Sequence, residues 1–329
     1  MNGGILYRRQ LEQAREAING ARRILIASHR NPDGDAVGSM LGLMHVLGGI
    51  GKSAVTFCPD GIPKKLWYLP GADITRSSVA GERFDATILV DTPDSGLFPA
   101  GLPDSDTRGV FIVIDHHKYF EPMGDVVLRT GASAVGEIIY DLAQASGWPI
   151  GPEAAKCLYT AVVSDTASFK YESATPSSHR VAADLIEKGV NPWEVATHLF
   201  ESFTISRQKL LAEVLATLKV GLGGKYASLH CTRKMMDDAG ASNGDLDGMV
   251  NNARAIEGVA LAAFLRETQD GTIRVSLRSK GNVDASQVAA RLGGGGHINA
   301  GGAYLKDITL IEAVQRVEEE AASVLTSHN

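Results

Sequence analysis

Three side chains that can bind a metal ion occur within seven residues near the N-terminus: His29, Asp33 and Asp35, in HRNPDGD. The apolar run 24–27 precedes them and reads as a buried strand that ends in a turn. In open α/β sheets, ligands bind outside the carboxyl ends of the strands. Two carboxylates and an imidazole at such a place suit Mn²⁺, Fe²⁺, Zn²⁺ or Mg²⁺. A solvated turn with capping aspartates is the alternative.

Two later apolar runs also end on an aspartate, and two histidines follow the second. The runs are ATILVD, which ends at Asp91, and VFIVID, which ends at Asp115 before His116 and His117. Buried parallel strands read as continuous apolar runs of this kind, so we expect these side chains at the same sheet edge as His29. There, one imidazole can bind a metal ion, its neighbour can face a substrate, and Asp115 can orient a ring. An ordinary polar turn is the alternative.

Asp165 ends the Ala-rich segment 152–165, which has a proline at its first turn and is typical of a helix. The residues around it in the sequence are largely apolar. Burial of an unpaired carboxylate is costly, and a metal ion is the partner that the other residues suggest. Asp165 therefore joins the candidate ligands.

The elements that must position these residues alternate between helices and strands. An amphipathic helix is expected over 7–20 and a buried helix over 38–48. Strands separated by helical or loop segments of 20 to 30 residues indicate parallel βαβ units. The fold class is therefore α/β with a parallel sheet. The expected strands are 24–27, 53–58, 86–91 and 110–115.

A Gly-Val-Asn-Pro sequence at 189–192 is the clearest domain boundary, and the helical pattern over 193–218 looks like a connector. We expect two domains, 1–190 and 219–329, joined by a helical linker at 191–218. The second domain mixes strands and helices less regularly, so a smaller α/β domain is expected. Its expected elements are strands 226–232, 259–267 and 273–279 and helices 245–254, 284–292 and 309–325.

A glycine-rich tract, LGGGGHINAGGAY at 292–304, surrounds His297. Four consecutive glycines let backbone N–H groups approach an anion closely, and a flexible turn is the alternative. The sequence has neither a GxGxxG that follows a first strand nor a GxxxxGK[ST] pattern. It therefore gives no support to a Rossmann dinucleotide site or a Walker P-loop.

Composition bounds the class of protein. A chain of 329 residues with 44% hydrophobic residues can fill two cores. The net charge of −6, without a long Lys/Arg block, argues against a protein that holds long duplex DNA. Three scattered cysteines favour buried thiols in a reducing compartment. No apolar stretch has the length of a signal peptide core or a membrane span, so we expect the cytoplasm and no membrane association.

Four segments, in order, resemble the motifs of the DHH phosphoesterases: HRNPDGD at 29–35, the aspartate of ILVDTPD at 91, DHH at 115–117 and SDTASFKY at 164–171. The tail SLRSKGNVDASQVAARLGGGGHINAGG resembles the associated DHHA1 domain. The resemblance covers nearly the whole chain, and the compact two-domain form is most similar to the nanoRNase and pAp phosphatase group. One departure is Ala167, which stands where a glycine is usual.

The resemblance implies a parallel-sheet DHH domain and a smaller α/β DHHA1 domain, with the active-site cleft between them. It also implies two divalent cations, Mn²⁺ first, with Mg²⁺, Fe²⁺ and Co²⁺ as alternatives. They would share a hydroxide that attacks phosphorus, while His117 contacts the scissile phosphate and Asp115 orients a histidine ring. The implied ligands are His29, Asp33 and Asp91 for one cation, and Asp35, Asp91, His116 and Asp165 for the other.

In the second domain, the resemblance implies a set of groups that hold the other end of the substrate. A guanidinium can bind a phosphate through two hydrogen bonds, which favours Arg278 and ranks Arg254 below it. Because one end would be held, long RNA is expected to be a poor substrate. The implied groups are Arg278, the backbone of Gly295 and Gly296, His297 and Arg254.

The implied activity is metal-dependent hydrolysis of short oligoribonucleotides, as a 3′ to 5′ exonuclease, and of 3′-phosphoadenosine 5′-phosphate (pAp). The first alternative is a phosphodiesterase of cyclic dinucleotides, or of linear pApA or pGpG, in second-messenger turnover. The second is a nucleotide-binding protein without activity, and the full set of ligand types argues against it. The sequence leaves open the native metal, the polarity of cleavage, the preferred substrate and whether the chain forms a homodimer.

Overall fold

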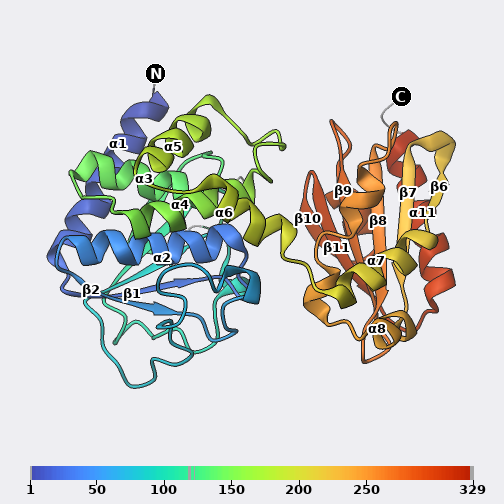
Figure 1. The fold of residues 1–329 in the computed structure, drawn as a ribbon, viewed down its shortest axis with the longest axis horizontal. Coiled ribbons are helices and arrows are strands. Elements are labelled where there is room, and N and C mark those ends of the chain that lie inside the picture. Colours follow the sequence, from blue (N-terminus) through green and yellow to red (C-terminus); the bar gives the residue numbers. More distant parts are fainter. Residues whose placement is uncertain (1, 118–119, 122, 327–329) are drawn as a thin grey trace. The chain divides into compact units, whose positions relative to one another are not determined.

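The computed structural model describes residues 2–117, 120–121 and 123–326, with the backbone alone at Asn2, Gly3, His297 and Thr326. Contacts within the chain divide it into two compact units, Met1–Ser202 and Phe203–Asn329. Each unit is built from a β-sheet and helices (Figure 1). The division between the units falls inside the segment 191–218.

A five-stranded parallel sheet organises the first unit, in the order β2-β1-β3-β4-β5. Because β1, β3 and β4 are parallel neighbours in register, their carboxyl ends lie at one edge of the sheet. The four strands expected from apolar runs are confirmed, whereas β5 has no counterpart in the expectation. The strands are β1 (Arg23–Ser28), β2 (Ser53–Phe57), β3 (Ala86–Val90), β4 (Val110–Asp115) and β5 (Val126–Arg129).

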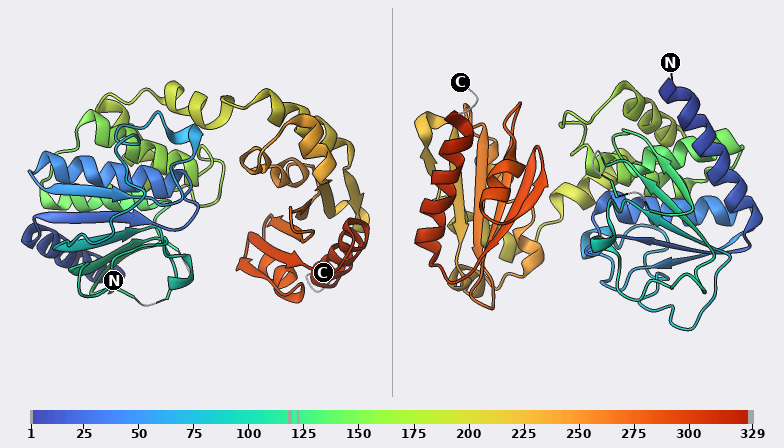
Figure 2. Two further views of the ribbon diagram at one scale, coloured as in Figure 1. Left: turned by 90° about the horizontal axis from the view of Figure 1, so that it is seen from below. Right: turned by 180° about the vertical axis from the view of Figure 1, so that it is seen from behind.

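Both faces of this sheet are covered, which explains why its strands are apolar throughout. Ile24 and Ile26 of β1 face a large core that contains the helices, and α2 runs alongside the strands (Figure 2). Leu25 and Ala27 face a smaller core that the long loops after β2 and β3 complete. The helices are α1 (Asn2–Gly20), α2 (Gly34–Gly49), α3 (Val135–Ser146), α4 (Pro152–Asp165), α5 (Pro176–Glu187) and α6 (Pro192–Ala196), followed by a π-helical turn (Thr197–Glu201).

A six-stranded mixed sheet organises the second unit, in the order β10-β11-β9-β8-β7-β6. β7 and β8 are parallel, and the other neighbours are antiparallel. The strands are β6 (Lys219–Gly221), β7 (Tyr226–Cys231), β8 (Leu261–Glu267), β9 (Ile273–Ser279), β10 (Gly295–His297) and β11 (Ala300–Leu305). The sequence predicts β7, β8 and β9, but it does not predict β6, β10 and β11.

Helices pack on both faces of the second sheet, and β8 alternates between the two cores. Leu261 and Ala263 face a core that includes α10 and α11, whereas Ala262 and Phe264 face a core that includes α7, α8 and α9. The helices are α7 (Ile205–Ala216), α8 (Arg233–Ala239), α9 (Val250–Arg254), α10 (Ala285–Arg291) and α11 (Leu310–Thr326). The helical connector expected over 193–218 is interrupted at Ser202–Thr204, and α7 belongs to the second unit.

The alternative of a flexible turn is wrong for Gly295 and Gly296 of the glycine tract. Gly295 and Gly296 lie in β10, which pairs antiparallel with β11 and forms an edge of the sheet. A side chain at Gly296 would collide with the carbonyl oxygen of Ala300, 2.2 Å from the Cβ position. Here glycine therefore allows two strands to approach closely.

Among the described residues, no helix combines the length and the apolar character that a membrane span requires.

Candidate metal centre

Side chains from the carboxyl edge of the first sheet form three overlapping groups of potential metal ligands. In each group, one ligand atom per residue lies within 4.8 Å of the others. All the metal ligands that the resemblance implies occur in these groups. The groups are His29, Asp33 and Asp91; Asp91, His116 and His117; and Asp35, His116 and Asp165.

The turn between β1 and α2 places the first two aspartates by ordinary helix capping. Asp33 is the N-cap of α2, and its Oδ1 accepts hydrogen bonds from the backbone N–H groups of Asp35 (3.0 Å) and Ala36 (3.1 Å). A side-chain oxygen at this position satisfies N–H groups that have no partner within the helix. The capping alternative is thus correct for Asp33, but its Oδ2 remains available to an ion.

Asp35 is buried and is held by three hydrogen bonds. Its Oδ1 accepts from Ser39 Oγ (2.8 Å) and from the N–H of Gly136 (3.1 Å), and its Oδ2 accepts from the N–H of Val135 (2.7 Å). The two backbone donors belong to the first turn of α3, so Asp35 caps a helix that begins a hundred residues later in the chain. No local pattern in the sequence indicates this contact.

Asp91 lies at the centre of the groups, directly after β3. Its Oδ1 lies 3.5 Å from His116 Nε2 and 3.6 Å from His117 Nδ1, and its Oδ2 lies 3.6 Å from His29 Nε2. These distances are longer than good hydrogen bonds. Oδ1 is buried and has no hydrogen-bond partner among the described residues. The two oxygens thus face different histidines, and one of them lacks the partner that a buried oxygen requires.

Two of the histidines are oriented by backbone carbonyl groups. The Nδ1–H of His29 donates to the carbonyl of Arg30 (2.9 Å), and the Nδ1–H of His116 donates to that of Ala132 (3.1 Å). Because a carbonyl only accepts, the hydrogen must be on Nδ1, and in a neutral ring Nε2 carries a lone pair. Each Nε2 faces the carboxylates, as is usual for histidines that bind a metal ion.

His117 is held differently from its neighbour. Asp115 Oδ1 accepts from the backbone N–H of His117 (2.7 Å), and Asp115 Oδ2 lies 3.3 Å from His117 Nδ1. Arg129 Nε donates to the carbonyl of His117 (3.0 Å). Asp115 is buried and does not occur in any of the ligand groups found among the described residues. Its position is that of a residue that orients a ring. The contact of Arg129 has no signal in the sequence.

In the absence of a metal ion, the carboxylates of the cluster favour the protonated form of its histidines. Burial alone would lower the pKa values of the histidines, but the neighbouring carboxylates raise that of His29 to about 9 and that of His116 to about 11. Burial raises the pKa of Asp165 to about 6, whereas the two histidines hold that of Asp91 below its usual value despite its burial. Divalent cations would replace these protons, so the donor set fits metal ions of the Mn²⁺ or Mg²⁺ type.

Close packing of α2 and α4 brings Asp165 to the cluster. A Cβ at Gly38 of α2 would lie 2.6 Å from the carbonyl oxygen of Cys157 in α4, so only glycine fits between the helices. Asp165 is the last residue of α4, and its Oδ2 lies 3.9 Å from His116 Nε2. The glycine in α2 therefore contributes to the site without touching it.

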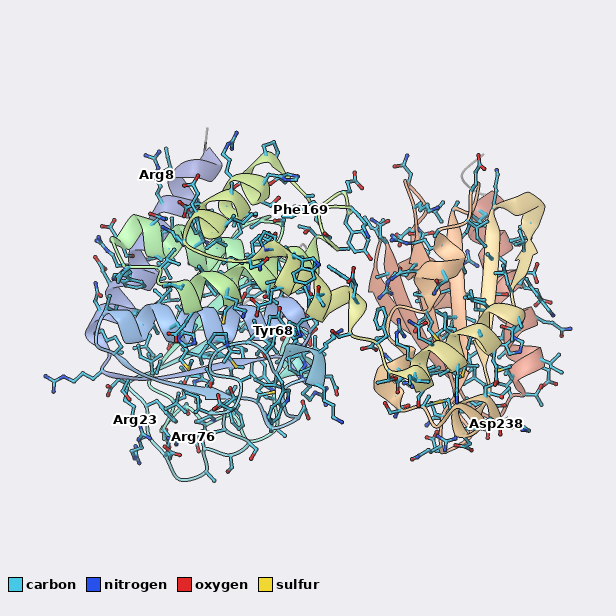
Figure 3. The ribbon with its side chains drawn as sticks, in the orientation of Figure 1. Arg8, Arg23, Tyr68, Arg76, Phe169 and Asp238 are labelled. Atoms are coloured by element: carbon cyan, nitrogen blue, oxygen red, sulfur yellow. The ribbon has the colours of Figure 1, made fainter. Side chains whose placement is uncertain are left out.

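The turn after Asp165 has an unusual backbone. Ala167, Ser168 and Phe169 have φ values of 48°, 60° and 61°, the left-handed region that residues with a Cβ rarely adopt. Thr166 Oγ1 accepts from the N–H of Phe169 (3.1 Å). The ring of Phe169, which is labelled in Figure 3, stacks on that of His179, with 4.4 Å between the ring centres. Ala167, where the resemblance expects glycine, thus lies at a position that favours glycine.

The residues expected to hold substrate lie in the second unit. Arg278 is half-buried on β9, and its Nη1 donates to the carbonyl of Leu277 (2.9 Å). Gly295 and Gly296 lie in the edge strand β10, and Arg254 ends α9. The backbone of His297 belongs to β10, whereas its side chain lies outside the described residues. All of them except Arg254 lie on β9 and β10, two strands of one sheet that are separated by β11.

Comparison with known proteins identifies related chains. A bifunctional oligoribonuclease and PAP phosphatase NrnA from Thermus thermophilus is 34% identical over 97% of this chain and 94% of its own length. A cyclic-di-AMP phosphodiesterase PdeA from Listeria monocytogenes is 27% identical over 94% of this chain, which spans 49% of that protein. The crystal structure of an exopolyphosphatase-related protein from Bacteroides fragilis has a TM-score of 0.87 and 28% identity, and covers 94% of this chain and 95% of its own.

Family models match both units. The model of the DHH family N-terminal domain matches residues 23–162, and that of the DHHA1 domain matches residues 223–325. The first match contains β1, β3 and β4, whose ends carry most of the clustered side chains. The second contains the sheet with Arg278 and the glycine tract. The chain therefore belongs to the DHH family of phosphoesterases, in the group with a C-terminal DHHA1 domain that includes the NrnA proteins.

Proposed function

We propose that this chain hydrolyses short oligoribonucleotides, as a 3′ to 5′ exonuclease, and pAp, with the help of two divalent cations. Asp91 is the observation that carries the proposal, because its two oxygens face different histidines and one of them is buried without a partner. A carboxylate in such a position suits a ligand shared by two ions. The similar protein from Thermus thermophilus is named for both activities.

The proposed ligands divide into two sets that share Asp91. Oxygen and imidazole donors of this kind suit Mn²⁺, the proposed ion, and also Mg²⁺, Fe²⁺ or Co²⁺. When bound, such a pair of ions lowers the pKa of a water molecule and neutralises the oxygens of a phosphate. The sets are His29, Asp33 and Asp91, and Asp35, Asp91, His116 and Asp165.

The protein's own groups prepare the site for this reaction. The carbonyl groups of Arg30 and Ala132 fix which nitrogens of His29 and His116 face the ions. Burial lowers the pKa of His117, but the neighbouring Asp115 and Asp91 outweigh this effect and raise it, which favours the protonated form of the ring. We propose that His117 contacts the scissile phosphate and donates its proton to the leaving oxygen.

The second unit is proposed to hold the other end of a short substrate. Arg278 would bind a phosphate through its guanidinium, and the N–H groups of Gly295 and Gly296 would approach the same anion. His297 and Arg254 complete the proposed set. If the ligand cluster hydrolyses one end of the substrate while the second unit binds the other end, substrates of a few nucleotides are favoured. The cytoplasm is the proposed location, where the three buried free thiols would remain reduced.

Metal reconstitution tests this proposal. Protein stripped with EDTA is supplied with Mn²⁺, Mg²⁺ or no metal. Phosphate release from pAp and the ladder of products from a 5′-labelled RNA 5-mer are then followed. We expect no turnover without metal, and with Mn²⁺ both phosphate release and stepwise shortening of the 5-mer from its 3′ end. Equal turnover in EDTA, or none with any divalent ion, would refute the proposal.

A further inference from the structure

One face of the second sheet is only partly covered by helices. On this face, the core beneath α7, α8 and α9 contains side chains of β7 and β8, such as Leu229 and Phe264, and none from β9 or β11 among the described residues. The strand β9 extends the sheet beyond that core, followed by β11 and β10 (Figure 1). The outer part of this face therefore lies beyond the apolar core that the helices cover.

Three side chains form a row across this face. Arg274 of β9 lies directly opposite Arg266 of β8 and opposite Tyr304 of β11, and directly paired residues point to the same side of a sheet. Phe264, two residues before Arg266, faces the core beneath α7 to α9, which fixes the side. Arg274 is exposed, and Tyr304 is 61% exposed.

The row combines positive charge with an aromatic ring. The guanidinium carbon of Arg274 lies 5.8 Å from the centre of the Tyr304 ring. Arg266 Nη1 donates to Asn243 Oδ1 (2.7 Å), and Asp247 is a nearby carboxylate that attracts Arg266. Burial, and after it the charge of Arg274, lower the pKa of Arg266. Like charges directly opposite each other destabilise a sheet, so folding alone does not account for this pair.

The row is adjacent to the proposed phosphate site on the same strand. Arg278 follows Arg274 by four residues on β9, so both point to the same face. Four residues of a strand span about 13 Å. Groups spaced in this way along a strand suit the successive phosphates and bases of an oligonucleotide.

We propose that Arg266, Arg274 and Tyr304 bind a further nucleotide of an oligoribonucleotide whose end is held at Arg278. The two arginines bind its phosphate, because guanidinium groups match phosphate oxygens. The exposed face of the tyrosine ring stacks with its base, as aromatic side chains do in single-stranded nucleic acid sites. This inference rests on the proposed function and assigns to that site a preference for oligonucleotides over pAp.

The test measures binding and turnover separately. Binding of a fluorescein-labelled RNA 5-mer is followed by anisotropy in EDTA, and KM is then measured with Mn²⁺ for the 5-mer and for pAp. We expect Arg274→Ala to weaken binding of the 5-mer about tenfold, because hydrogen bonds to a charged phosphate are lost. We expect Tyr304→Leu, which lacks the aromatic face, to weaken it about fivefold. Both changes should lower the preference for the 5-mer over pAp.

Arg316→Ala is the matched control. Arg316 is exposed on α11, which packs on the opposite face of the sheet, and its removal changes the net charge equally. If the Arg274 variant binds the 5-mer as tightly as the wild type, or if the control weakens binding equally, the inference is wrong. If the wild type binds the 5-mer but hydrolyses neither substrate with metal, the proposed function fails, whereas the anisotropy comparison still decides on the surface.

Discussion

The cluster of potential metal ligands in the first unit and the surface formed by Arg266, Arg274 and Tyr304 in the second differ in how firmly their side chains are held. In the cluster, Asp35 and Asp115 are buried and bonded to backbone N–H groups, and Asp91 is 3% exposed. On the second surface, Arg274 and Tyr304 are exposed to solvent. Preorganised groups suit the stabilisation of a transition state, whereas exposed groups suit the binding of a flexible substrate. We therefore expect changes in the cluster to lower kcat and changes on the surface to raise KM.

The largest effect is expected from Asp91→Ala, since it removes a ligand from both proposed ions. We expect kcat for pAp to fall by more than about 10³-fold. Mn²⁺ should raise the Tm of the wild type, because an ion that binds only the folded state stabilises it, and should have little effect on the variant. Asp73→Ala, which removes an exposed carboxylate of the same unit, is the control. Activity close to that of the wild type in the Asp91 variant would disprove the proposal that Asp91 is a ligand of both ions.

Asp115→Asn tests the residue that orients His117. The amide keeps the shape of the side chain but removes the charge that favours the protonated ring, so the acid form of His117 becomes less populated. We expect kcat to fall about 10- to 100-fold, the usual range for a group that acts through a neighbour. The apparent pKa of the alkaline limb of the kcat profile should also fall. An unchanged pH profile would show that Asp115 has only a structural role.

Arg278→Lys tests the phosphate contact of the second unit. Lysine keeps the charge but cannot make the bidentate hydrogen bond of a guanidinium to a phosphate. We expect this loss to raise KM about tenfold. Values of kcat should stay within about twofold, since the change is remote from the cluster in the sequence and belongs to the other unit. Steady-state kinetics with pAp provides the measurement. A fall in kcat at unchanged KM would place Arg278 in the chemical step and weaken the contrast between the two regions.

The smallest effect is expected from Ala167→Gly, in the turn after Asp165. The left-handed conformation costs alanine about 1 to 2 kcal/mol, and glycine loses about 0.5 to 1 kcal/mol through its greater freedom in the unfolded chain. The variant should therefore be more stable by about 0.5 kcal/mol, as measured by urea unfolding with Mn²⁺ present. Ala183→Gly, at an exposed position inside α5, should instead destabilise by about 1 kcal/mol. A loss of stability at position 167 equal to that at 183 would contradict the strained turn.

Sequence reasoning locates the cluster well because its residues follow local rules. Each apolar run of the first sheet is a buried strand, and parallel strands bring His29, Asp91 and Asp115 to one edge. The contacts that orient these residues are not local. The bond of Asp35 to the first turn of α3 and the carbonyl of Ala132 next to His116 depend on the packing of distant segments, which one sequence does not reveal.

The second unit is less predictable for a related reason. The strands β10 and β11 have the sequences GGH and AGGAYL and contain no β-branched residue, so their composition gives little indication of a strand. Without those strands, the register that places Tyr304 beside Arg274 is unknown. Arg278 itself is found through a motif and a resemblance. Its neighbours on the sheet surface become visible only when the strand order is known.

The most direct test of the proposed activity compares five substrates in parallel. Mn²⁺-loaded protein is offered pAp, pApA, a labelled RNA 5-mer, an RNA 24-mer and cyclic di-AMP, and the products are followed over time, with the Asp91→Ala variant as control. We predict hydrolysis of pAp and of the 5-mer, with the 24-mer slow. Turnover confined to pApA or cyclic di-AMP, or equal rates on the 24-mer and the 5-mer, would contradict the proposed function.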